Sequence, residues 1–129
     1  DIELMHQSVS IFEDLNIMWD KHLIDWHLIK CGKEYDTERE VLYFRFHGIY
    51  PLWYEFYQRS YRQTPFDNNS LKQYMIDLPF CLGNKVKKID GTPMRCLTFD
   101  VEKSENEGLL LLFKKVKEAD EKHNPTEVE

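Results

Sequence analysis

The hydrophobic pattern changes its period near residue 80, and this change limits the chain to folds that combine helices with a β-hairpin. Upstream, apolar residues recur every three or four positions, as they do on one face of an α-helix. Downstream, Asp90-Gly91 separates two strand-like runs, 85–89 and 92–99. Asp-Gly between such runs is typical of a type I′ turn, which needs positive φ at both central residues. We therefore expect a hairpin and an α+β fold that is mostly helical.

The part upstream of the hairpin predicts several helices. Residues 1–48 are expected to be a helical N-terminal segment, either one helix or two that are separated near Asn16 or Asp20. A second apolar stripe predicts a helix from 49 to 61. Pro51 is expected in the first turn of that helix, where proline is tolerated.

The segment between the first two helical stripes leaves alternatives open. Residues 32–37 are polar and predict a loop, after which Asp36 or Thr37 can cap a helix that begins at Glu38. Residues 41–46 are β-branched and aromatic, which favours a strand, whereas their position after a possible cap favours a helix end.

The last element is predicted to be a helix over 104–122. Ser104 and Glu107 stand three residues apart before an apolar run, which is the spacing of a capping box. The run at 109–113 is apolar nearly all round, so it either packs in the core or meets a protein partner. Residues 123–129 are expected to form a tail.

Length and composition are those of one globular domain over 1–129, with 42% hydrophobic and 14% aromatic residues. The cysteines are Cys31, Cys81 and Cys96, and no pair has CxxC spacing. This predicts free thiols in a reducing, cytoplasmic compartment. No apolar run is long enough to predict a membrane helix. Because the chain begins at Asp1 without methionine or an apolar leader, we expect it to belong to a longer parent chain.

Charge is distributed unevenly along the chain. Residues 1–58 hold five basic and eleven acidic side chains, and residues 96–129 hold five basic and nine acidic ones. Residues 59–95 hold seven basic and only three acidic side chains. A basic middle segment between acidic flanks predicts a polyanionic partner, unless the flanks neutralise it in the folded protein.

Six side chains of this middle segment are candidate nucleic-acid contacts: Lys72, Gln73, Lys85, Lys87, Lys88 and Arg95. The first two lie on a short helix that is predicted after the polar turn 67–70. In a hairpin with a two-residue turn, Lys85 and Lys87 share one face and Lys88 lies on the other. Lysine and arginine supply most of the affinity for nucleic acid through phosphates. Alternatively, lysines on an edge strand only prevent aggregation.

The sequence lacks the motifs of common catalytic sites. HExxH, GxSxG and Walker sequences are absent, and His22 and His27 are five residues apart, so we expect no catalytic, cofactor or metal site. The carboxylates of Asp14, Asp20 and Asp25 are expected on a solvated face. Four aromatic residues are expected in the core rather than on a base-stacking platform: Trp53, Tyr54, Tyr57 and Tyr61.

Residues 50–100 resemble a known class of DNA-binding domain. The order is an aromatic helix with Tyr50, Trp53 and Tyr57, a polar cap before Leu71, a short helix and a hairpin. This segment is similar to winged-helix domains that follow the ATPase module of virulence-associated E and poxvirus-type primase-helicases of phages and mobile elements. It is more loosely similar to RFX-type winged helices.

The resemblance implies a winged-helix unit over 49–101, with the short helix as recognition helix and the hairpin as wing. The implied function is a non-catalytic domain that binds nucleic acid or positions a substrate in a larger replication protein. Asp77 departs from this pattern, since an acidic residue in a recognition helix opposes base reading. The alternative function is a winged-helix module that binds a protein through 109–113 and does not bind DNA.

Overall fold

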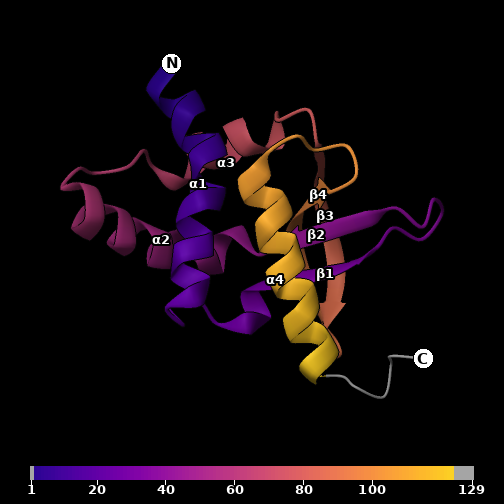
Figure 1. Ribbon diagram of the computed structural model, residues 1–129. Helices are drawn as coiled ribbons and strands as arrows, with labels where there is room; N and C mark the ends of the chain where they lie inside the picture. Colours follow the sequence, from indigo (N-terminus) through magenta and orange to yellow (C-terminus); the bar gives the residue numbers. More distant parts are fainter. Residues whose placement is uncertain (1, 124–129) are drawn as a thin grey trace.

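The computed structural model describes residues 2–123, which form a layer of helices on one face of an antiparallel sheet (Figure 1). The predicted α+β class is therefore confirmed, whereas residues 124–129 of the expected tail lie outside the described residues. None of the described helices is both long and apolar enough to cross a membrane. In chain order the elements are α1 (Ile2–Asp20), η1 (Trp26–Leu28), β1 (Ile29–Lys33), β2 (Glu40–Phe44), α2 (Phe46–Tyr61), α3 (Asn68–Ile76), β3 (Cys81–Ile89), β4 (Thr92–Asp100) and α4 (Glu107–His123).

The main core lies between the helices and one face of the sheet, which we call the helix face. The strand order is β1-β2-β4-β3, and each neighbouring pair is antiparallel. Phe12 of α1 makes edge contacts with Phe44 and Phe99 of the sheet, at centroid distances of 6.1 and 5.2 Å. Trp53 of α2 and Leu71 of α3 are also fully buried in this core. Aromatic packing of this kind stabilises a core beyond the area that it buries.

The β3–β4 hairpin confirms the register that the Asp-Gly turn predicts. Asp90 and Gly91 have φ values of 51° and 82°, and the strands pair from that turn as expected. Strand β2 pairs with β4 only over 97–100, so the distal half of the hairpin is a two-stranded ribbon. Pro93 lies in this ribbon, where β4 has a neighbouring strand on one side only. Proline has no backbone N–H to donate, and the ribbon tolerates this better than the centre of a sheet would.

The N-terminal segment is helical only in its first half, so the expectation for residues 1–48 is wrong beyond α1. Helix α1 continues through Asn16, whose side-chain amide donates to the Phe12 carbonyl at 2.8 Å and to the Gly108 carbonyl at 2.7 Å. The second apolar set forms η1 and β1 instead of a helix. The antiparallel pairing of β1 with β2 supplies the backbone partners that a helix would otherwise provide.

The helix expected at Glu38 is also wrong. Glu38 has a φ of 55° in the turn between β1 and β2, and the Thr37 hydroxyl accepts the Arg39 N–H at 3.3 Å within this turn. Of the two alternatives for residues 41–46, the strand is confirmed as β2.

Two helices begin at other residues than the sequence predicts. Helix α2 begins at Phe46, so Pro51 lies inside the helix rather than in its first turn. The side-chain oxygen of Asn106 accepts the N–H of Leu109 at 3.0 Å, so Asn106 caps α4. Ser104 accepts only the N–H of Asn106, also at 3.0 Å. The predicted capping box is therefore wrong, because a second good N-cap residue follows the first by two positions.

Candidate nucleic-acid interface

A second apolar cluster covers the sheet face that points away from the helices, which we call the far face. Its buried members are Val41, Tyr43, Ile89 and Cys96. Because side chains alternate along a strand, this cluster fixes the orientation of the whole hairpin. Four of the candidate contacts are thereby divided between the two faces of the ribbon: Lys85 and Lys87 on the far face, Lys88 and Arg95 on the helix face.

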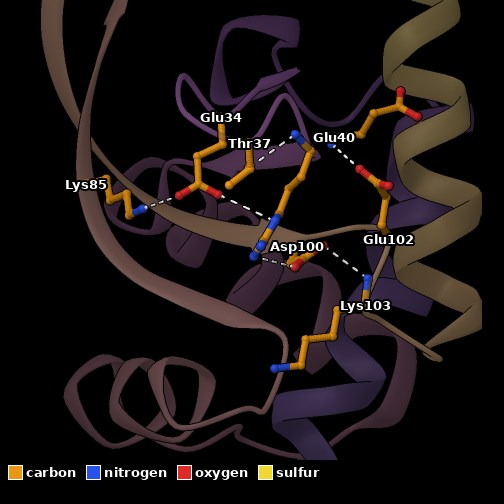
Figure 2. A network of polar contacts seen from close by, with 8 residues as sticks. Glu34, Thr37, Glu40, Lys85, Asp100, Glu102 and Lys103 are labelled. Carbon is orange, nitrogen blue, oxygen red and sulfur yellow. Dashed lines mark hydrogen bonds and ion pairs between the residues drawn. The ribbon is translucent and has the colours of Figure 1, made fainter.

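Lys85 forms an ion pair with the first third of the chain. Its ammonium lies 3.1 Å from Oε1 of Glu34, which follows β1 (Figure 2). The other oxygen of Glu34 lies 3.7 Å from Nε of Arg39, and Nη1 of Arg39 lies 3.0 Å from Oδ2 of the buried Asp100. Asp100 also accepts the backbone N–H of Lys103 at 3.0 Å. Acidic residues of the flanks thus neutralise part of the basic segment.

Lys87 lies against the second cluster. Its ammonium is 5.1 Å from the ring centroid of Tyr43, within the range of a cation–π contact. Burial raises the pKa of the Tyr43 hydroxyl. Lys87 is therefore half-buried over an aromatic ring rather than free in solvent.

Lys88 and Arg95 point into solvent on the helix face of the ribbon. Both are exposed, and neither forms an ion pair with any residue in the described range 2–123. Val86 pairs with Arg95 across the ribbon and is 64% exposed. This face therefore presents two unneutralised cations beside an apolar side chain.

The two candidates on α3 have partners on the helix surface. The ammonium of Lys72 is 3.3 Å from Nε2 of His47, at the beginning of α2. The amide of Gln73 donates to the Asp77 carboxylate at 3.2 Å. The cap of α3 is as predicted, because the carboxylate of Asp67 accepts the backbone N–H of Ser70 at 3.0 Å, and this bond lowers the pKa of Asp67.

Side-chain contacts also join the two edge strands, although β1 and β3 are not neighbours in the sheet. Besides Glu34 and Lys85, His27 Nδ1 lies 3.1 Å from Oδ2 of Asp90 at the hairpin turn. Both contacts require the sheet to curl so that its edges approach each other. A Cβ on Gly32 would lie 2.7 Å from the ring of Tyr43, so only glycine fits between β1 and this ring.

Sequence reasoning missed these partners. Glu34, Arg39 and His27 were not candidates, because each meets a residue more than fifty positions away. The only sequence signal was the alternation of acidic and basic residues at 33–40, which does not identify a partner.

The expectation that Asp14 lies on a solvated face is wrong. Asp14 is buried, where its carboxylate accepts the indole N–H of Trp53 at 2.9 Å and the hydroxyl of Tyr61 at 2.5 Å. The bond to Asp14 and burial raise the pKa of Tyr61 to about 12. Trp53 and Tyr57 are buried in the core as expected, whereas Tyr54 is half-buried and Tyr61 is 47% exposed, so the core prediction is wrong for Tyr61. These polar bonds hold α1 against α2.

Cys31, Cys81 and Cys96 are free, and the Cys31 thiol donates to Asp120 at 3.0 Å. Burial and this bond raise the pKa of Cys31 to about 12, so its thiol is protonated and unreactive at neutral pH. Within residues 2–123, no three histidine, cysteine, aspartate or glutamate side chains are grouped so as to hold a metal ion.

Comparison with known proteins adds no relative. No protein-family model matches the chain, and no match was found among curated proteins or solved structures.

Proposed function

We propose that this chain is a non-catalytic winged-helix domain that binds nucleic acid. The proposal is supported by the order α1-β2-α2-α3-β3-β4 and by the three-stranded arrangement β2-β4-β3, which is the plan of a winged helix. Strand β1 adds a fourth strand at the edge of β2. In this interpretation α3 is the recognition helix and the β3–β4 hairpin is the wing.

The observation that carries the proposal is the pair of free cations on the helix face of the hairpin. Lys88 and Arg95 are exposed and form no ion pair among the described residues, so phosphates can bind them without displacing a carboxylate. Lys72 adds a third cation on α3, beside His47. Lys85 contributes less to the affinity for phosphates, because its ammonium already forms an ion pair with Glu34.

We further propose that the domain serves a larger replication protein of the primase-helicase type, where it would position the nucleic-acid substrate. This part rests on the resemblance of residues 50–100 to winged helices of such proteins. The hairpin would hold the phosphate backbone, and the chemistry would belong to another part of the parent protein.

Fluorescence anisotropy with labelled single- and double-stranded DNA tests the binding. We expect affinity to fall steeply as salt rises, because bound phosphates release counterions. Substituting both Lys88→Glu and Arg95→Glu should weaken binding at least about tenfold and lower the salt slope by about 2. The melting temperature should stay nearly unchanged, because both side chains are exposed.

A matched control is available on α4. Lys114 and Lys122 are also exposed and form no ion pair in the described part of the chain, so Lys114→Glu with Lys122→Glu makes the same change in net charge. The control should alter affinity much less than the hairpin variant. If both double variants weaken binding equally, or if the wild-type chain does not bind at low salt, the proposal is wrong.

Helix α4 supports a second candidate function, a protein-interaction module. Leu110 and Leu111 are 38% and 48% exposed, while their neighbours Leu109 and Leu112 are buried. Exposed leucines in tandem on one helix are typical of an interface. Light scattering after size exclusion tests its self-association form. We expect a mass that rises with concentration and returns to the monomer value in Leu111→Glu. A monomer at all concentrations would contradict this form.

A further inference from the structure

We propose that the β1–β2 hairpin is a built-in electrostatic cover on the nucleic-acid-binding hairpin. In this arrangement Glu34 holds the ammonium of Lys85 where a phosphate would otherwise bind, so nucleic acid competes with the protein's own carboxylate for the far face. The inference rests on the proposed function and concerns the far face of the same hairpin, opposite the face that carries Lys88 and Arg95.

The cover depends on a contact between elements that the sheet keeps apart. Glu34 follows β1, at one edge of the sheet, and Lys85 belongs to β3, at the other edge. The curl of the sheet brings their charged groups to 3.1 Å. Without β1, the strands β2, β4 and β3 would leave the far face of the ribbon open to a polyanion.

The carboxylate of Glu34 is held in place before any ligand arrives. Its second oxygen lies 3.7 Å from Nε of Arg39, as an ion pair without a hydrogen bond, and the Arg39 guanidinium is in turn held by the buried Asp100 at 3.0 Å (Figure 2). A preorganised acceptor loses little side-chain entropy when it binds a lysine. Glu34 is therefore a stronger competitor than a free surface carboxylate would be.

The ion pair between Glu34 and Lys85 is nevertheless exposed enough for a phosphate to replace the carboxylate. The Lys85 side chain is 43% exposed, so a phosphate can approach it from solvent. Exposed ion pairs are individually weak and are screened by salt. Asp36 and Glu38 of the same turn are exposed and add repulsion toward a polyanion. The cover therefore lowers affinity without abolishing it.

A double-mutant cycle with labelled double-stranded DNA tests the proposal. We expect Glu34→Gln to raise affinity about tenfold at 50 mM salt and to steepen the salt slope by about 0.9, as one more phosphate contact does. In a Lys85→Gln background the same substitution should give little gain. Glu38→Gln is the matched control, because it removes one charge from the same turn without touching Lys85.

Each outcome decides the question. An equal gain from Glu34→Gln and Glu38→Gln overturns the cover, since net charge alone would then explain it. A gain that persists without Lys85 also overturns it. Binding that requires Lys88 and Arg95 but ignores Glu34 supports the proposed function and rejects the cover. If no variant binds at 50 mM salt, both the proposed nucleic-acid binding and the cover are wrong.

Discussion

Replacing Asp14 with alanine should destabilise the fold, because this buried carboxylate is the acceptor for two aromatic side chains. Its oxygens accept the indole N–H of Trp53 and the hydroxyl of Tyr61. Asp14 is 3% exposed and Trp53 is fully buried, so water cannot replace the carboxylate at the indole. Tyr61 is 47% exposed, so its hydroxyl can turn to solvent instead.

The magnitude therefore follows from the indole N–H alone. A buried donor that loses its acceptor costs about 1–3 kcal/mol, and removing a carboxylate from the interior offsets part of this. We expect Asp14→Ala to lower the free energy of unfolding by about 2 kcal/mol, which corresponds to roughly 8 °C in Tm for a domain of this size. Asp14→Asn keeps an oxygen for the indole and should lose less than about 1 kcal/mol.

Urea unfolding followed by circular dichroism measures these differences. In a Trp53→Phe background, Asp14→Ala should cost about 1 kcal/mol less, because no indole donor remains to lose its partner. The reasoning is refuted if Asp14→Ala lies within about 0.5 kcal/mol of the wild type. It is also refuted if the alanine and asparagine variants are equally unstable.

Three further predictions follow from single contacts. The pKa of Tyr61 is raised to about 12, chiefly by its bond to Asp14. Stability from this bond is present below pH 10 and is lost as pH rises toward 12, so the excess unfolding free energy of the wild type over Tyr61→Phe should shrink between pH 10 and pH 12 in urea titrations. Cys31, with a pKa of about 12 from burial and its bond to Asp120, should react slowly with iodoacetamide at pH 8, and Asp120→Asn should speed the reaction. Gly32→Ala should lower the unfolding free energy by about 1–3 kcal/mol in urea titrations, because the added Cβ meets a buried tyrosine ring at 2.7 Å.

Local signals in the sequence predicted the elements that depend on neighbouring residues. The turn at Asp90-Gly91 determines the hairpin register by itself, because its two positive φ values fix which residues face each other. Asp67 caps α3 through Ser70, only three positions away. The N-cap of α4 is Asn106, two residues after the predicted cap Ser104, because both residues are good N-caps and the sequence does not show which of them accepts the helix N–H.

Elements that depend on distant partners could not be predicted. In strand β1 (Ile29–Lys33) only Ile29 and Cys31 alternate as apolar residues, which is too short a pattern to predict a strand, and the strand forms because β2 pairs with it. The burial of Asp14 depends on Trp53, which lies 39 positions away and approaches only when α1 packs on α2. Likewise, the local charge balance overstated the basic surface, because Lys85 meets Glu34 across 51 positions.

The net charge of −6 and the cations of the hairpin act on a nucleic acid over different distances, so they should affect different rate constants. Net charge acts through the long-range field, which salt screens beyond about 8 Å at physiological ionic strength, and it therefore lowers the association rate. Lys88 and Arg95 act on contact, so losing them should mainly speed dissociation. Stopped-flow anisotropy should thus show a faster off-rate for the Lys88→Glu and Arg95→Glu double variant. The Lys114→Glu and Lys122→Glu control should slow association only, and a control that dissociates as fast as the hairpin variant would mean that the hairpin is not the contact surface.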